Sequence, residues 1–312
     1  MLSVICPIYN EEKYIGACIE SIIVQDYPKD DLEVIFADGM STDRTRDIVA
    51  EYAAKCPWIH LIDNPKRIVT PGLNAAIKAS KGDIIMRLDA HASYPNNYFS
   101  SLEKYLKESE AENVGGVCIT LPPDNTAKSK AIAAVLSSKF GMGNSSFRVG
   151  SSKCCEVDTV PFGCWHKELF DKIGLFDEDL IRNQDDEFNG RIRKHGGLII
   201  LYPDIEIKYF GRDSIGKLAK MFYQYGLFKP LVNKKLGAPA TIRQFFPFAL
   251  VIGLIVGLII SVLWHAFSLI YFIGIIIYLL LSLISSINSG GSISKILIQT
   301  ICYPVVHLSY GW

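Results

Sequence analysis

Residues 82–95 read GDIIMRLDAHASYP, and this stretch decides how the first part of the chain folds. A largely apolar run ends in an aspartate and a histidine, Asp89 and His91, which are two residues apart. In an extended chain, residues i and i+2 point to the same side, so this carboxylate and imidazole would face one way. Such a pair can bind a divalent ion, which can in turn bridge a diphosphate. The alternative is that Asp89 caps the next turn and that His91 has no role there.

The stretch is the last of four apolar runs that we interpret as buried strands. The expected strands cover 2–9, 32–39, 59–64 and 83–89, and the expected helices between them cover 11–24, 42–55 and 71–80. Buried strands that alternate with helices indicate a parallel sheet with helices on both faces. The sequence therefore predicts an α/β domain of the Rossmann-like kind.

Polar side chains follow three of these strands, at residues 7–11, 38–43 and 89–91. Ligands of open α/β sheets bind outside the carboxyl ends of the strands. Asp38 and Asp89 end separate strands of one sheet, so they can converge on a single ligand. The recurrence of polar strand ends favours a binding site over the turn-cap alternative.

The charge of the chain is unevenly distributed, although its formal net charge is zero. Residues 208–312 contain nine Lys or Arg and one acid, Asp213, which gives +8 and leaves −8 for residues 1–207. The first residues, MLSVICPIYN, lack the basic start of a signal peptide. The eight cysteines have no metal-ligand spacing, which is typical of reduced thiols in a cytosolic domain.

Two long apolar runs, 245–264 and 267–287, contain no charged residue over 20 and 21 positions. A bilayer core about 30 Å thick needs roughly 20 apolar residues of helix, so we predict a transmembrane hairpin. The alternative is a buried helical hairpin of a soluble core, where such helices are rarely uncharged on every face. An excess of Lys and Arg in short loops marks the cytoplasmic side of a membrane. We therefore expect residues 1–243 to be cytoplasmic, on the inner or plasma membrane of the cell.

Residues 293–309 are apolar but include Lys295, Gln299, Pro304 and His307. This pattern predicts an interfacial or re-entrant helix, with a third membrane span as the alternative. The expected organisation is a domain over 1–207, basic juxtamembrane helices over 208–243, and a membrane region over 244–312.

Four segments, taken in order, resemble one enzyme family. They are VICPIYNEEKYI (4–15), ADGMSTDRT (37–45), PGLNAAIKASKGDIIMRLDAHA (71–92) and PFGCWHKELFDKIGLFDEDLIRNQDDEFNGRIRKHGG (161–197). The chain resembles the family 2 inverting glycosyltransferases, which have the GT-A fold. The DAHA variant and the C-terminal hairpin are most similar to bacterial exopolysaccharide enzymes of the succinoglycan type.

The resemblance implies a donor site at the strand ends. The residues implied to line the nucleobase pocket are Pro7, Tyr9 and Glu11; Asp38 would hold the base or ribose, and Gly72 and Asn74 would lie beside the nucleotide. Asp89 and His91 would occupy the metal motif of the family, which is usually Asp-x-Asp. Histidine in the third position still ligates Mn²⁺ or Mg²⁺ but removes one negative charge, and Mn²⁺ tolerates imidazole better than Mg²⁺ does.

The resemblance also implies a general base at a helix start. Alignment on RIRKHG puts Gln184 and Asp185 on the acidic pair of the family, so Asp185 would be the base, and a slip of one residue would select Asp186. Carboxylates at a helix N-terminus also suit the helix dipole, which is the structural alternative for Asp186 and Glu187. Arg191 is expected to be structural. Asp158 and Trp165 are candidates for the acceptor side, with a core position as the alternative for Trp165.

The function predicted from these observations is transfer of a sugar, with inversion, from a nucleotide-diphosphate sugar to a hydroxyl group of a lipid-linked saccharide. The donor is expected to be UDP-linked, and no nucleic-acid partner is expected. The chain has no QxxRW signature of processive synthases after its Asp-Asp segment, which favours single addition. Two alternatives remain. One is a polyprenyl-phosphate glycosyltransferase, and the other is an inactive nucleotide-sugar-binding membrane scaffold, supported by Gln184 and His91.

Overall fold

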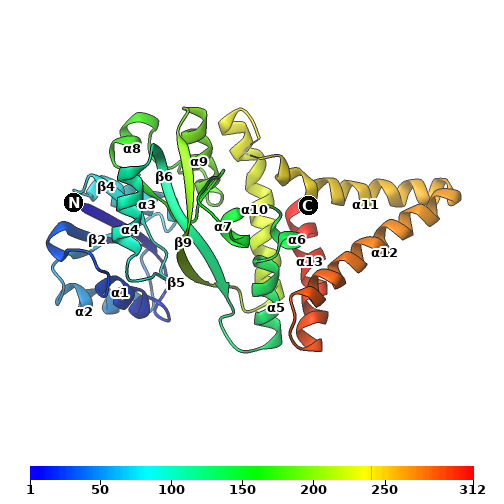
Figure 1. Ribbon diagram of the computed structural model, residues 1–312, viewed down its shortest axis with the longest axis horizontal. Helices are drawn as coiled ribbons and strands as arrows, with labels where there is room; N and C mark the ends of the chain where they lie inside the picture. The colour runs from blue at the N-terminus through cyan, green and yellow to red at the C-terminus, as the bar shows by residue number, and fades with distance from the viewer. Residues whose placement is uncertain (240) are drawn as a thin grey trace. The chain divides into compact units, whose positions relative to one another are not determined.

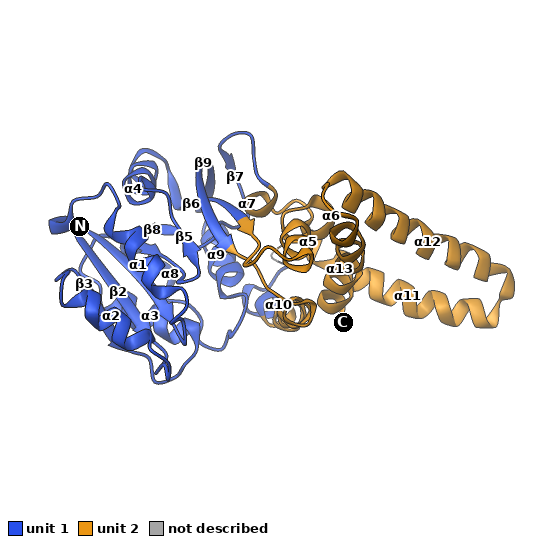
Figure 2. Cartoon of the chain, turned by 90° about the horizontal axis from the view of Figure 1, so that it is seen from below, with its two compact units in different colours: residues 1–119, 150–209, 232–240 blue, residues 120–149, 210–231, 241–312 orange. Residues whose placement is uncertain are grey.

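The computed structural model describes residues 1–239 and 241–312, and the chain divides into two compact units (Figure 2). The first unit contains residues 1–119, 150–209 and 232–240, and the second contains 120–149, 210–231 and 241–312. Neither unit is contiguous in sequence. Residues 120–149 lie within the predicted domain 1–207 but pack with the C-terminal region.

The first unit is built on a mixed sheet with the strand order β3-β2-β1-β4-β8-β6-β9-β5, with β7 paired to β9 (Figure 1). The strands are β1 Leu2–Ile8, β2 Leu32–Asp38, β3 Ile59–Asp63, β4 Ile84–Arg87, β5 Ala92–Ser93, β6 Ala111–Leu121, β7 Cys155–Glu156, β8 Cys164–His166 and β9 Leu198–Phe210. The four predicted strands pair in parallel, as expected. The sheet then continues with antiparallel pairs, beginning with β8 on β4.

Helices cover both faces of the parallel half, as predicted. Successive residues of a strand point to opposite faces. Val4 and Val34 share a core cluster with Ile15 and Ile19 of α1. Ile5 and Ile35 are buried on the other face, and α3 packs against their strands. The helices here are α1 Ile15–Ile23, α2 Thr45–Ala53, α3 Val69–Ala79 and α4 Tyr98–Glu108.

The first two helices begin later than the sequence predicts, at Ile15 rather than residue 11 and at Thr45 rather than residue 42. The reason is that the two loops before them bind each other. The backbone N–H groups of residues 10, 11 and 12 donate to side chains of the second loop, Ser41 at 2.9 Å, Thr45 at 2.7 Å and Asp43 at 3.1 Å. Asn10 and Met40 adopt left-handed backbone conformations that turn these loops.

The antiparallel half carries two helices, α8 Glu168–Ile173 and α9 Gln184–Lys194, and α9 begins at the candidate site. β9 alternates between buried and exposed residues along much of its length, which is the pattern of an antiparallel strand with one face covered. The single-turn 3₁₀ helix Lys29–Asp31 leads into β2.

The second unit is helical. Its elements are α5 Ala127–Leu136, α6 Lys139–Met142, α7 Ser146–Val149, α10 Ile215–Leu236, the 3₁₀ helix Ile242–Gln244, α11 Phe245–Leu263, α12 His265–Asn288 and α13 Ile293–Gly311; the end of α10 belongs to the first unit. Its core joins α5, α10 and α13 through apolar residues that include Ile132, Leu218, Phe222, Tyr303 and Val306. Helix α5 is not among the elements predicted from the sequence.

Two helical segments, Ile242–Leu263 and His265–Asn288, are long and apolar enough to cross a membrane. They form an antiparallel pair joined at Trp264 (Figure 1), and the Tyr271 hydroxyl donates to the Leu254 carbonyl across them at 3.0 Å. Only 17% and 6% of the residues in their most apolar stretches are buried, so the two helices do not match the alternative of a buried hairpin in a soluble core. Among residues 1–239 and 241–312, α13 does not meet the same criterion of length and composition.

The predicted third helix of the tail forms as α13, and its polar residues bond to α12. The paired side chains are Tyr278 with His307, Ser285 with Tyr303, Ser286 with Thr300 and Ser289 with Gln299, at 2.7–3.1 Å. His307 Nε2 lies 2.9 Å from the Phe140 carbonyl, which can only accept, so Nε2 carries the proton. Pairing of this kind lets polar residues lie inside an apolar helix bundle.

Candidate active site

Asp38, at the end of β2, is completely buried and accepts several hydrogen bonds. Its donors are the Ser41 backbone N–H at 3.0 Å, the Ser41 hydroxyl at 2.5 Å and the Arg46 guanidinium at 2.6 Å. Arg46 also pairs with Asp63 at 2.9 Å, so it joins the ends of β2 and β3. The hydrogen bonds of Arg46 to Asp38 and Asp63 raise its pKa, and the bond to Asp38 has the larger effect. Asp38 therefore organises the loop of residues 38–46, and its contact with a base or ribose stays a prediction.

Tyr9 presents an exposed aromatic ring beside this loop, with 44% of its surface accessible. A Cβ atom at Gly39 would lie 3.1 Å from Tyr9 Cδ2, so glycine leaves room for the ring. Pro7 and Glu11, on either side of Tyr9, are partly buried. An accessible ring at the strand ends suits stacking on a nucleobase, and the nucleotide contacts of these residues stay a prediction.

Asn74 connects α3 to the segment that precedes α9. Its amide donates to the Phe176 carbonyl at 2.8 Å and to Glu178 at 3.0 Å, and it accepts from the Phe176 N–H at 3.0 Å. Gly72 packs closely, because a Cβ atom there would lie 2.8 Å from Asn64 Nδ2. Both residues have structural roles here, and the predicted position beside the nucleotide stays a prediction.

Arg87 is the charged centre of the site. It lies at the end of β4 with only 4% of its surface exposed. One terminal nitrogen pairs with Asp185 and the other with Asp89 at 3.3 Å. Burial would lower the pKa of Arg87, but the charges of Asp185 and Asp89 outweigh this effect and raise it. The structure thus brings together the predicted metal-motif aspartate and the predicted base, which are 96 positions apart (185 − 89).

Asp185 lies in the first turn of α9, with 38% of its side chain exposed. Burial raises the pKa of its carboxyl group, Arg87 lowers it, and the neighbouring charges of Asp89 and Asp186 raise it further; the net direction is upward. A carboxylate with a raised pKa is a stronger base, provided that it stays ionised at the working pH.

His91 contacts the loop that follows β1. Its Nδ1 lies 3.4 Å from a carboxylate oxygen of Glu11, and its ring packs on Tyr209 with centroids 5.2 Å apart. The turn after β4 is held by the buried Tyr94, whose hydroxyl lies 2.8 Å from the Asp89 N–H and 3.2 Å from the Asp89 carbonyl. The ends of β1 and β4 therefore meet at Glu11 and His91.

A divalent ion would find few protein ligands here. Among residues 1–239 and 241–312, no group of three or more His, Cys, Asp or Glu side chains is arranged to hold a metal. Asp89 and His91 each expose 22% of their side chains, so they are accessible to a ligand. One carboxylate and one imidazole fit an ion that takes its remaining ligands from diphosphate and water, as Mg²⁺ and Mn²⁺ do.

Arg191 of α9 has a structural role, as predicted. Its guanidinium makes two bonds to the buried Glu187, at 2.7 and 2.9 Å, and it donates to the carbonyls of Ile173 and Leu175. Gln184, in the position of the first family acid, is 8% exposed. Asp185 and Asp186 are thus left as the candidates for the base in this turn.

Trp165 belongs to the core, which corrects its candidacy for the acceptor side. It is 2% exposed, and its ring contacts Phe170, Phe176 and Phe188 at centroid distances of 5.8–6.1 Å. An indole buried in this way has no face free for a sugar. Asp158 is partly buried in the segment before β8, and its contact with an acceptor stays a prediction.

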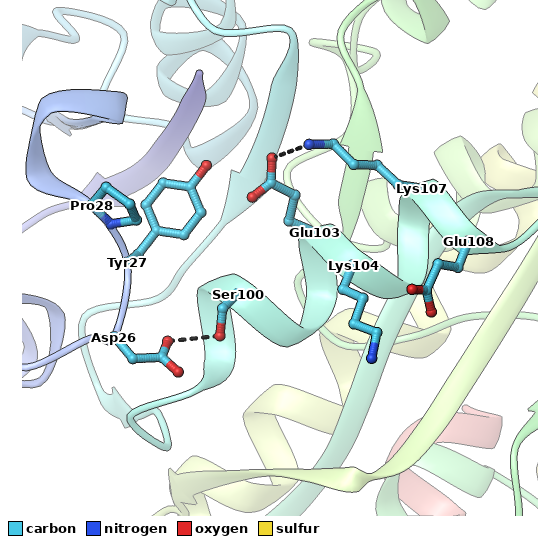
Figure 3. A pocket seen from close by; sticks show the side chains of 8 residues that line it. All are labelled: Asp26, Tyr27, Pro28, Ser100, Glu103, Lys104, Lys107 and Glu108. Atoms are coloured by element: carbon cyan, nitrogen blue, oxygen red, sulfur yellow. Dashed lines mark hydrogen bonds and ion pairs between the residues drawn. The ribbon is translucent and has the colours of Figure 1, made fainter.

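A pocket of about 400 Å³ lies elsewhere in the first unit, against α4 (Figure 3). Tyr27 and Pro28 line it from the connection that enters β2, which is the end of the strand opposite Asp38. Polar groups at its rim pair with one another, Glu103 with Lys107 and Ser100 with Asp26, both at 2.7 Å. This pocket is therefore separate from the candidate site.

Comparison with known proteins identifies the family. The model of glycosyl transferase family 2 matches residues 3–170, which is more than half of the chain. The chain belongs to glycosyl transferase family 2. It is therefore a glycosyltransferase, and the resemblance stated from the sequence is confirmed.

Two curated relatives cover most of the chain. One is the dolichyl N-acetyl-alpha-D-glucosaminyl phosphate 3-beta-D-2,3-diacetamido-2,3-dideoxy-beta-D-glucuronosyltransferase of Methanococcus voltae, 34% identical, with 75% of this chain and 74% of the relative covered. The other is the succinoglycan biosynthesis protein ExoA of Rhizobium meliloti, 29% identical, with 79% and 74% covered. The second relative agrees with the succinoglycan-type resemblance.

Solved structures confirm the GT-A fold. The mannosyltransferase PcManGT from Pyrobaculum calidifontis, in complex with GDP-Man and Mn²⁺, has a TM-score of 0.64 at 20% identity and covers 97% of this chain and 86% of its own. TarS 1–349 from S. aureus, in complex with UDP, has a TM-score of 0.52 at 18% identity, with 75% and 69% covered.

Arg87, Arg46 and Tyr94 were not among the site residues predicted from the sequence. A charged residue inside an apolar run was the visible signal for Arg87.

We expect Asp38→Asn to lower the free energy of unfolding by about 1–3 kcal/mol, because a buried carboxylate that accepts charged hydrogen bonds is lost. Asp63→Asn is the matched control, since Asp63 pairs with the same arginine but is 57% exposed, and it should cost no more than about 1 kcal/mol. Thermal and denaturant unfolding of the full chain in detergent measure both effects. Equal losses of unfolding free energy in the two variants would show that the burial of Asp38 does not add to its stabilising effect.

Proposed function

We propose that this glycosyltransferase moves a sugar from a UDP-linked donor to a hydroxyl group of a lipid-linked saccharide, with inversion at the anomeric carbon. The observation that carries the proposal is the shared ion pair of Arg87, which holds Asp89 and Asp185 at one place at the carboxyl ends of the sheet. Donor and acceptor must meet where these two groups meet. A relative named for a dolichyl-linked sugar as its substrate supports the choice of acceptor.

In the proposed mechanism, Tyr9 stacks on the base and the diphosphate lies at the end of β4. A divalent ion, Mn²⁺ or Mg²⁺, held by Asp89 and His91, would supply positive charge that neutralises the diphosphate. Asp185 accepts the proton of the acceptor hydroxyl as its oxygen attacks the anomeric carbon. The new glycosidic bond forms on the face opposite the breaking bond to the nucleoside diphosphate, which leaves with that electron pair. The sugar therefore inverts.

The membrane part of the proposal rests on α11 and α12. Together they form a hairpin that crosses the bilayer twice, and the basic segment 208–243 keeps the first unit on the cytoplasmic side. Lysines near an anionic surface contribute about 1 kcal/mol each to binding. Lys235 is not available for this purpose, because it pairs with Asp177 at 2.7 Å and Asp179 at 2.8 Å. Single-addition transfer onto a membrane-held saccharide is consistent with this anchor.

A second candidate is a glycosyltransferase whose acceptor is polyprenyl phosphate itself. One relative favours it, the dolichyl-phosphate beta-glucosyltransferase ALG5C of Trichomonas vaginalis, which is 28% identical over 45% of this chain. A phosphate acceptor has no proton to lose at neutral pH, so it needs no strong base. The inactive-scaffold alternative is not supported, because the chain belongs to an enzyme family and keeps Asp89 and Asp185 together.

We expect Asp89→Ala to abolish Mn²⁺-dependent binding of UDP, because the metal-binding carboxylate is removed. His91→Asp should restore the usual Asp-x-Asp pattern, keep activity, and shift the preference from Mn²⁺ toward Mg²⁺. Calorimetric titration of UDP with each metal, and with chelator, measures binding apart from turnover. Unchanged turnover and UDP binding in chelator would contradict the metal assignment.

We expect Asp185→Asn to bind UDP like the parent but to transfer sugar about 10²–10⁴-fold more slowly, because a positioned general base is lost. Asp186→Asn is the control and should have a much smaller effect, since neighbouring helical residues point roughly 100° apart. The raised pKa of Asp185 places the acid limb of the parent pH–rate profile above that of an ordinary aspartate, because turnover is lost as Asp185 is protonated.

The outcomes of this pair separate the candidates. If Asp186→Asn is inactive in sugar transfer and Asp185→Asn is active, the base is Asp186. Activity in both would favour the phosphate acceptor.

We expect a reporter fused at Gly237 to read as cytoplasmic and one fused at His265, in the turn of the hairpin, to read as external. Paired alkaline phosphatase and fluorescent-protein fusions at each position measure the side of the membrane. A cytoplasmic signal at His265 would show that the two apolar helices lie in the interface instead of crossing.

A further inference from the structure

Arg87 is an unusual residue for its position. It lies in the parallel half of the sheet, and its neighbours in β4, Ile84 to Met86, are almost fully buried. A buried cation is costly unless it is paired and hydrogen-bonded. Its partners come from two distant places, Asp89 at the end of the same strand and Asp185 98 residues later, on α9. Its backbone is fixed as well, because the Arg87 N–H donates to the Gly163 carbonyl at 3.0 Å.

We propose that Arg87 is a positioning residue for sugar transfer, which holds the carboxylate of Asp185 at a fixed place relative to Asp89. The proposal rests on the assignment of Asp185 as the base. Its new content is that Arg87, at the end of β4 beside the proposed donor site, sets the position of Asp185, the proposed base that activates the acceptor.

Arginine fixes the spacing of the two carboxylates more strictly than lysine would. A guanidinium is a rigid planar fork that serves two carboxylates from two separate nitrogens. An ammonium can also bridge two carboxylates, as Lys235 bridges Asp177 and Asp179, but it does so from one nitrogen on a flexible stem. Arg87 uses one terminal nitrogen for Asp185 and the other for Asp89. Because both bonds leave one rigid group, the spacing of the two carboxylates is fixed by the fork.

Asp185 lies in the first turn of α9, which follows Asn183 in a left-handed backbone conformation. Farther along, α9 is anchored by the ion pair of Glu187 with Arg191 and by Phe188 in the aromatic core. The ion pair with Arg87 joins the carboxylate of Asp185 to the end of β4.

A double-mutant cycle tests the proposal, with transfer turnover measured for Arg87→Met, Asp185→Asn and the double variant. Arg87→Met should lower turnover about 10²-fold, as expected for loss of a correctly placed base. UDP affinity with Mn²⁺ should change much less than turnover. The double variant should be no slower than Asp185→Asn alone, because Arg87 acts through Asp185. Multiplied losses in the double variant, or parent-like turnover in Arg87→Met, would overturn the proposal.

The pH profile adds a measurement that a purely structural role would not move. Asp185 faces Arg87 and Asp89 from β4 and its end, and Asp186 from its own helix. Arg87 lowers the pKa of Asp185, so without this cation the pKa rises and the acid limb of Arg87→Met should move to higher pH. An unmoved limb together with lower turnover would assign Arg87 to folding alone and overturn the proposal.

Two further variants control for folding. Arg87→Lys keeps the buried charge but loses the fork, so it should unfold near the parent temperature and still turn over at least tenfold more slowly. Lys66→Met removes an exposed cation that pairs with Glu178 and should behave like the parent. Parent-like turnover in Arg87→Lys would overturn the positioning role. If Asp185→Asn transfers at the parent rate, the assigned base and this proposal both fail; if only Arg87→Met does, the proposal alone fails.

Discussion

A buried guanidinium cannot stay unpaired, and this constraint on Arg87 determines how the active site is assembled. Water cannot reach the side chain, so its charge must be balanced by carboxylates inside the protein. Asp89 is local to the strand, but Asp185 lies on α9, which follows the antiparallel strands β6 to β8 in the chain. The pairing therefore makes the two halves of the site depend on each other.

The other fixed points of the site also join distant segments. Asp38 and Arg46 tie the loops after β2 and β3, and Asn74 and Thr70 tie α3 to residues 176–180. Each tie includes a buried polar residue, Asp38, Asn74 or Thr70, that forms hydrogen bonds with protein partners. Tyr9 and the carboxylates of Asp89 and Asp185 are accessible in part, which suits their proposed roles toward substrates. The result is a rigid frame with a small number of accessible reactive groups.

The sequence predicted the parallel half of the sheet well because buried parallel strands read as continuous apolar runs. It placed the starts of α1 and α2 too early, because the N–H groups of residues 10–12 bind the loop of residues 41–45 instead of continuing a helix. It could not decide whether Trp165 is exposed, because the sequence around an aromatic residue near a loop is the same whether the ring lies in the core or in a binding site. Nor could it foresee α5, whose apolar face packs on α10 and α13, far away in sequence. Arg87 was visible as a charge in an apolar run, but its second partner is a property of the fold.

The anomeric configuration of the first product tests the central claim most directly. A single attack opposite the leaving diphosphate, with one carboxylate as base, converts an α-linked UDP-sugar into a β-linked product. Proton NMR of the transferred sugar, or of the sugar released by slow hydrolysis before it equilibrates, reads the configuration from the coupling at the anomeric proton. The account predicts the β configuration from the first turnover onward. An α-configured first product would contradict it, because retention requires a mechanism other than the single displacement assigned to Asp185.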